Sequence, residues 1–170
     1  MTHSCCDSTC DTEKNADVCD RCGARGHTVP REALESLLTP TALKRLQPGS
    51  YLFDASPDCD IVYFSKDSDS YFTKRDLRVR VGIKESEPPI PICYCFRHTL
   101  ESARAEIQVT GRSTVAAEIT KEIRARRCAC EVKNPSGRCC LGEVNKAVKT
   151  LLSVMFPANS ECPIATAGME

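Results

Sequence analysis

The sequence of 170 residues lacks tryptophan, has only 5% aromatic residues, and shows no excess of charge, because 23 Lys and Arg residues balance 23 Asp and Glu residues. A net charge of zero argues against a general polyanion binder. The shortage of aromatic rings removes the stacking surfaces on which single-stranded nucleic acid is bound. No run reaches the length of about 18 apolar residues that a membrane-spanning helix needs. We therefore expect no nucleic acid partner and no membrane insertion.

Recognisable catalytic machinery is also missing. The sequence contains no P-loop, no dinucleotide-binding glycine pattern and no visible nucleophile–base pair. Its three histidines, His3, His27 and His98, are scattered along the chain. Hydrolytic chemistry needs such groups in matched sets. The sequence therefore predicts a protein that is not an enzyme.

Cysteine, by contrast, is abundant, with 13 residues in the chain. Such a number indicates either a disulfide framework or thiolates that hold metal. An odd count fits complete pairing poorly, and the polar first ten residues contain no apolar segment of the kind found in a secretory signal. These features favour reduced thiolates, and we expect a cytoplasmic metal-binding protein.

The first half of the chain has the pattern of a small, mostly β structure. Residues 31–38 follow a proline and place apolar side chains on one face, which predicts a short helix. Residues 51–53 and 61–64 are strand-like, and the alternating apolar residues of 77–81 predict a third strand. The proline-containing segment 84–91 continues neither pattern and is typical of a linker.

The second half is helical by the same criteria. Helices are predicted over about 99–109, 113–127 and 144–155, the first two with capping residues at their starts. The sequence therefore predicts an α+β fold in which a β-rich half precedes a helical half.

The cysteines of the helical half lie in two loops. Cys93 and Cys95 form a C-x-C motif, and Cys128 begins a second cysteine motif beyond two predicted helices. This is the plan of the bacterioferritin-associated ferredoxin module, in which two loops at neighbouring helix ends hold a [2Fe–2S] cluster. The negative charge of such a cluster is stabilised by the partial positive charge of helix N-termini.

Both loops, residues 91–96 and 128–142, resemble those of the iron–sulphur cluster-binding metallochaperone family, which is related to the N-terminal domain of the archaeal copper chaperone CopZ. Three segments of the first half are similar to the same family: residues 51–53, 57–64 and 77–85. The similarity covers about residues 19–144. It implies a zinc site in the β-rich half and a [2Fe–2S] cluster in the helical half.

Six cysteines compete for the four ligand positions of that cluster. They are Cys93, Cys95, Cys128, Cys130, Cys139 and Cys140. The C-x-C pair supplies two ligands. For the other two we favour Cys130 with Cys140, because the family's second pair is separated by a similar loop. Cys128 with Cys139 is the alternative, since the spacing of the ferredoxin module favours Cys128, and the sequence leaves the choice open.

The predicted zinc site begins with Cys19 and Cys22, a C-x-x-C knuckle followed by a glycine that tolerates the tight turn. The resembled family carries two more cysteines in a later turn. Here Cys59 matches one of them, but the other position is Asp54. Zinc accepts a carboxylate oxygen, so these four residues are the favoured ligand set. His27 is the alternative fourth ligand.

For Cu(I), which prefers soft sulphur ligands, the candidates are Cys5, Cys6 and Cys10 near the N-terminus. The resemblance implies a cytoplasmic copper chaperone whose cluster reduces Cu(II) or senses redox state. It would pass Cu(I) to a copper-transporting ATPase or another copper-handling protein. An excess of basic residues over 121–149 most commonly offsets cluster charge or forms a solvated helix face, and the alternative is docking of an acidic redox or acceptor protein. The alternatives are a [2Fe–2S] electron-transfer protein without copper delivery and a metal-responsive regulatory protein.

The predicted organisation has four parts. They are a disordered cysteine-containing tail (1–16), a zinc-binding β-rich domain (17–86), a helical [2Fe–2S]-binding domain (87–157) and a flexible C-terminal tail (158–170).

Overall fold

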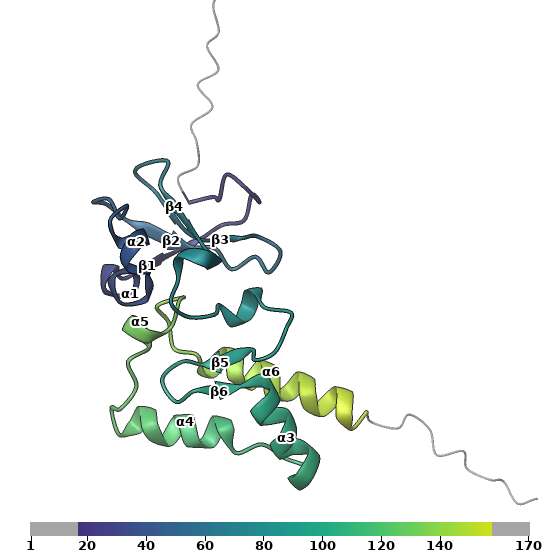
Figure 1. Cartoon of the computed structure of the whole chain (residues 1–170). Helices are drawn as coiled ribbons and strands as arrows, with labels where there is room; N and C mark the ends of the chain where they lie inside the picture. The colour runs from purple at the N-terminus through teal and green to yellow at the C-terminus, as the bar shows by residue number, and fades with distance from the viewer. Residues whose placement is uncertain (1–16, 158–170) are drawn as a thin grey trace, which may run out of the picture.

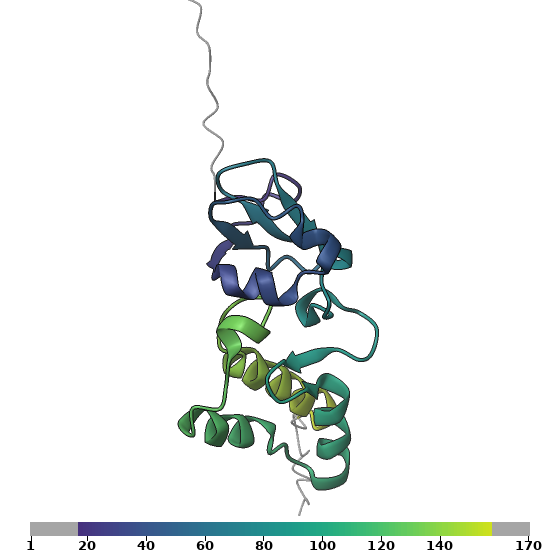
Figure 2. The same cartoon turned by 60° about the vertical axis from the view of Figure 1, so that its left-hand side comes forward.

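The sheet and the long helices occupy opposite ends of the molecule. The computed structural model describes residues 17–157, and its first half lies above its second in the view of Figure 1. Figure 2 shows the chain passing between the halves through an irregular segment after residue 84. The predictions made for residues 1–16, including the three copper candidates there, and for residues 158–170 lie outside the described residues.

A four-stranded antiparallel sheet forms the first half. Its strands β1 (His27–Val29), β2 (Tyr51–Phe53), β3 (Ile61–Ser65) and β4 (Tyr71–Thr73) lie in sequence order. β2 and β3 are the two strands expected from their apolar runs. β1 and β4 were not predicted, because strands of three residues are too short to display an alternating pattern.

Two short helices, α1 (Arg31–Leu37) and α2 (Pro40–Leu43), pack against this sheet. The shared core includes Ala33, Leu34, Leu37, Tyr51, Phe53, Val62, Tyr63 and Phe72. A second, smaller cluster joins Leu52 and Phe64 to Cys19 and Cys59. Because successive side chains of a strand point to opposite faces, Leu52 carries this cluster on the other side of the sheet from Tyr51 and Phe53.

The predicted strand at 77–81 is wrong. Leu77 forms an isolated bridge with Leu38, and the backbone N–H of Arg78 donates to the Leu37 carbonyl over 2.8 Å. The segment therefore runs along the end of α1 instead of pairing with a strand. Its alternation is nevertheless real, since Leu77 and Val81 are buried in the core. An extended segment with one buried side has the same sequence pattern as a strand.

The second half contains a two-stranded hairpin and four helices. These are β5 (Pro91–Cys93), β6 (His98–Thr99), α3 (Leu100–Thr110), α4 (Val115–Arg124), α5 (Cys130–Lys133) and α6 (Leu141–Met155). The three predicted helices are present with shifted ends. Thr99 caps α3 by accepting a hydrogen bond from Ser102 N at 3.2 Å, and Gly111, at φ 71°, ends it. The α+β fold class is confirmed.

The two halves are bonded to each other through the turn that follows α5. The buried Tyr63 hydroxyl donates to the Pro135 carbonyl over 2.8 Å. Gly137 lies so close to the first half that a Cβ atom there would be 2.6 Å from Pro30 Cδ. α5 itself packs on α1 (Figure 1). The sheet therefore positions the loop that carries the later cysteines.

Candidate metal centres

Four side chains from two separate turns meet beside the sheet. Their ligand atoms, the thiol sulphurs of Cys19, Cys22 and Cys59 and a carboxylate oxygen of Asp54, all lie within 4.8 Å of one another. Within residues 17–157 this is the one group of three or more such side chains arranged to hold a single ion. The structure thus brings together the four residues favoured from the sequence.

Local backbone geometry presents the first pair of sulphurs. Gly23 N donates to the Cys19 carbonyl over 2.8 Å, and Cys19 N donates to the Ala24 carbonyl over 2.9 Å, which closes a tight turn. Gly23 has a φ of 72°, a left-handed conformation that glycine adopts without steric cost. The second pair comes from the connection between β2 and β3, in which Asp54 directly follows β2.

Burial and hydrogen bonds act against each other in the electrostatics of this group. Cys19 and Asp54 are both 0% exposed, whereas Cys22 is exposed. Burial raises the pKa of the Cys19 thiol to about 12. Burial by itself would also raise the pKa of the Asp54 carboxyl, but hydrogen bonds from the Cys19 thiol, a backbone N–H and the Cys22 thiol outweigh it, and the pKa falls to about 2. Asp54 is therefore an anion that faces three thiols.

His27 does not join these four residues. Its Nε2 atom lies 2.9 Å from the Ser136 carbonyl, and its ring packs 5.3 Å from the ring of Phe53. Burial lowers the pKa of its imidazole. The alternative fourth ligand thus lies between the two halves, where it contacts the turn after α5.

A second group of thiols gathers in the helical half. Cys95 Sγ lies 3.6 Å from Cys130 Sγ, and Ala129 N donates to Cys95 Sγ over 3.3 Å. A hydrogen bond with the Cys140 thiol lowers the pKa of Cys93 to about 6, and the same contact raises the pKa of Cys140. These four cysteines come from the β5–β6 hairpin, the start of α5 and the residue before α6.

The two remaining loop cysteines occupy different surroundings. Cys93, Cys130 and Cys140 are buried, but Cys139 is exposed and Cys128 is only half-buried. Cys95 is half-buried too, but its contact with Cys130 joins it to an inner set of Cys93, Cys95, Cys130 and Cys140. This set is not arranged for one ion in the manner of the first group.

Sequence reasoning missed Lys84, which lies against the first group. Its side chain is wholly buried, and its Nζ atom is 3.5 Å from Asp54 Oδ1. Lysine is normally exposed, so no sequence pattern marks such a position, although Lys84 falls in a segment similar to the metallochaperone family.

The comparisons agree with this geometry. A family model described as "Zinc binding domain" matches residues 16–78, which include all four residues of the first group. The X-ray structure of the CopZ N-terminal domain from Archaeoglobus fulgidus superimposes with a TM-score of 0.65 and 30% identity, over 83% of this chain and 99% of that one. The chain belongs to the CopZ N-terminal domain family. The resemblance to the CopZ N-terminal domain found in the sequence is confirmed, and the iron–sulphur part of that resemblance stays a prediction.

The copper chaperone CopZ of Archaeoglobus fulgidus is 39% identical over 92 residues, which are 54% of this chain. They are 43% of CopZ, so the chain spans less than half the length of this curated relative. The match to the CopZ domain structure extends well beyond the zinc half into the helical half. Among residues 17–157, no helix has the length and apolar character needed to cross a membrane.

Proposed function

We propose that this chain is a cytoplasmic metal chaperone that holds zinc in its first half and a [2Fe–2S] cluster in its second, with Cu(I) as its cargo. The observation that supports this best is the presence of two separate thiol groups, each assembled from two turns or loops, in a fold of the CopZ N-terminal domain family. In this proposal the protein is not an enzyme.

The proposed zinc ligands are Cys19, Cys22, Asp54 and Cys59. Three sulphurs and one carboxylate oxygen are a donor set that zinc accepts, and four ligands close a structural site. Their spacing fits one ion. Zinc would bind the knuckle to the β2–β3 turn, on the face of the sheet where the apolar cluster is small.

The proposed cluster ligands are Cys93, Cys95, Cys130 and Cys140. Four thiols in two loops suit a cluster. The burial of Cys93, Cys130 and Cys140 and the contact of Cys95 with Cys130 favour this set over Cys128 and Cys139. Cys140 directly precedes the 15-residue helix α6, whose N-terminal partial positive charge stabilises thiolates. A [2Fe–2S] group supplies one-electron chemistry when bound.

For the cargo, thiols outside these eight ligands are needed. Cys139 is exposed beside the inner thiol group, and Cys5, Cys6 and Cys10 add soft ligands near the N-terminus. CopZ, with which the chain shares its fold family, is a copper chaperone. The partners proposed on this basis are a copper-transporting ATPase or another copper-handling protein, and an acidic redox protein.

Substitution of the fourth zinc ligand gives a direct test of the site. Asp54→Ala should weaken zinc binding by more than the ~10–100-fold that loss of a residue supporting a ligand costs. Asp54→Cys should tighten it, because a thiolate is the better donor for a structural site. His27→Ala should leave zinc affinity unchanged, since its Nε2 faces the Ser136 carbonyl. Competition with a chromogenic chelator at fixed pH measures all three, and equal affinity in wild type and Asp54→Ala contradicts the assignment.

Copper binding distinguishes the proposed copper chaperone from the alternative, an electron-transfer protein that does not deliver copper. Anaerobic titration of the metal-loaded protein with Cu(I), in competition with a Cu(I)-specific chelator, should show that the chain retains copper without releasing zinc or iron. A variant with Ser in place of Cys5, Cys6, Cys10 and Cys139 should lose copper and keep both other metals. If the wild-type protein yields all copper to a weak chelator, the electron-transfer alternative is supported instead.

A further inference from the structure

A buried lysine contacts the proposed zinc centre. Lys84 is the last residue of a 3-10 turn, η2 (Gly82–Lys84), and its side chain is 0% exposed. Removing an ammonium group from water is costly unless the charge is paired and its protons are hydrogen-bonded. The contacts of Lys84 must therefore compensate for its burial.

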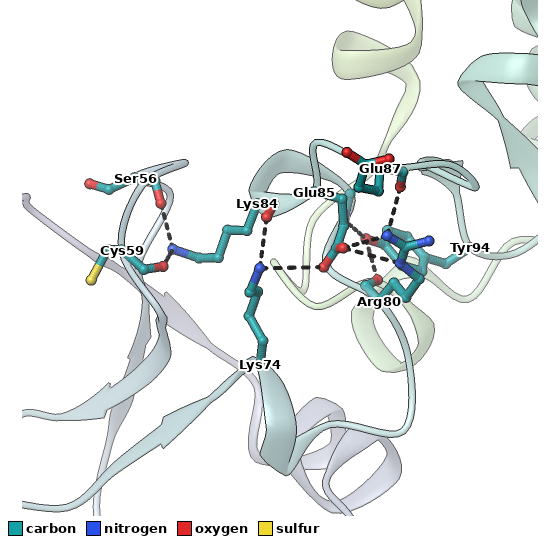
Figure 3. A network of polar contacts seen from close by, with 9 residues as sticks. Ser56, Cys59, Lys74, Arg80, Lys84, Glu85, Glu87 and Tyr94 are labelled. Atoms are coloured by element: carbon teal, nitrogen blue, oxygen red, sulfur yellow. Dashed lines mark hydrogen bonds and ion pairs between the residues drawn. The ribbon is translucent and has the colours of Figure 1, made fainter.

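Within residues 17–157, the polar contacts of the Lys84 ammonium group lead to the connection between β2 and β3. The Nζ atom donates to the Ser56 carbonyl over 2.6 Å and to the Cys59 carbonyl over 3.0 Å (Figure 3). It also lies 3.5 Å from Asp54 Oδ1. The ammonium thus reaches both proposed zinc ligands of this connection, one through its carboxylate and one through its backbone.

The two oxygens of Asp54 have different partners. Oδ1 accepts a hydrogen bond from Ser56 N at 2.8 Å and faces Lys84 Nζ. Oδ2 lies 3.1 Å from Cys22 Sγ, on the side of the thiols. The carboxylate is therefore held with one oxygen toward the ammonium and the other toward the sulphurs.

We propose that Lys84 is a positioning residue of the zinc centre, which holds Asp54 so that Oδ2 alone faces the metal and which offsets part of the ligands' negative charge. This inference rests on the proposed zinc site. Three thiolates and one carboxylate bring four negative charges to a dication, so the loaded site is an anion in a buried position. A fixed ammonium beside the carboxylate compensates for one of them.

The competing explanation is that Lys84 only ties η2 to the turn through the two carbonyls. The two explanations differ in what the carboxylate contributes. If Lys84 acts through Asp54, its effect depends on Asp54 being present. If it is only a tie between backbone segments, its effect does not depend on the side chain at position 54.

The first experiment compares Lys84→Met with Lys74→Met, using chelator competition for zinc at fixed pH. Lys84→Met should lower zinc affinity by about 10–100-fold, the usual cost of losing a group that orients a metal ligand. Lys74 is the matched control, because its Nζ donates to the Lys84 carbonyl over 3.1 Å and pairs with Glu85 rather than with the zinc turn (Figure 3). Lys74→Met should keep wild-type affinity, and equal losses in the two variants overturn the inference.

A double-mutant cycle then measures how much of the effect of Lys84 on zinc affinity depends on the Asp54 carboxylate. In an Asp54→Cys background, the loss caused by Lys84→Met should shrink several-fold, because no carboxylate remains to be oriented. If Lys84→Met lowers zinc affinity as much in the Asp54→Cys background as in the wild type, Lys84 only links η2 to the turn, and the proposal is overturned. Lys84→Gln keeps a hydrogen-bond donor for the carbonyls without the charge, and it serves if Lys84→Met does not fold. Wild-type zinc affinity in Lys84→Gln also overturns the proposal.

Cobalt provides a readout of geometry. With Co²⁺ in place of zinc, Lys84→Met should weaken the visible d–d bands, since a carboxylate whose Oδ1 has lost the ammonium can turn to offer both oxygens and raise the coordination number. An unchanged spectrum contradicts the positioning role. Cys19→Ser, measured in parallel, tests the site itself: retained zinc there refutes the proposed centre, whereas lost zinc with an unaffected Lys84→Met refutes only the role of Lys84.

Discussion

Cys19→Ser is expected to yield a protein without zinc whose first half, residues 17–86, has lost its stable fold. Cys19 is 0% exposed and joins the small cluster of Leu52, Ile61 and Phe64 on the face of the sheet that carries the proposed zinc ligands. Structural zinc sites bind with apparent free energies of about 10–16 kcal/mol, which matches or exceeds the ~5–15 kcal/mol stability of a whole domain. Loss of the ion therefore removes most of the stabilisation of this face.

Metal analysis of the purified variant measures the loss of zinc, and amide hydrogen exchange measures the loss of fold in each half. Cys139→Ser is the matched control, because Cys139 is an exposed thiol that belongs neither to the proposed zinc ligands nor to the inner thiol group. It should keep its zinc and the wild-type exchange pattern. A Cys19→Ser protein that retains zinc at the wild-type level would refute the site.

If the proposed assignment is correct, Cys93→Ser removes the [2Fe–2S] cluster and leaves zinc in place. The Cys93 thiol contacts that of Cys140 in the inner group, and a serine hydroxyl is a poor substitute for a thiolate ligand of iron. All four proposed zinc ligands precede the segment that joins the halves, so their geometry survives. Iron should fall from about two atoms per chain to nearly none, together with acid-labile sulphide and visible absorbance.

The other loop cysteines decide between the two ligand pairs. Cys130→Ser and Cys140→Ser should behave like Cys93→Ser, because both thiols are buried in the inner group. Cys128→Ser and Cys139→Ser should keep the cluster. The reverse result assigns the cluster to Cys128 and Cys139 and shows that the loop rearranges when iron binds.

The sequence predicted the helices and strands whose apolar patterns are long or are bounded by clear capping and turn residues. The strands at β2 and β3 and the helices α1, α3, α4 and α6 were expected. β1, β4 and the β5–β6 hairpin were missed, since two or three residues carry no periodicity. The segment 77–81 was wrongly predicted to be a strand. An alternating apolar pattern shows that one side of an extended segment is buried, but it does not show whether the backbone pairs with another strand.

For the candidate metal centres, the sequence by itself determined which turns hold the cysteines, because a C-x-x-C or C-x-C spacing places two sulphurs on the same side of one turn. It also indicated the family. Only the tertiary structure decided which distant side chains complete each group: Asp54 lies beside Cys19 while His27 contacts Ser136, and Cys140 lies inside while Cys139 is exposed. The burial of Lys84 against Asp54 was likewise beyond the sequence. Local spacing constrains neighbours within a turn, whereas convergence of remote turns depends on strand direction and on the packing of the two halves.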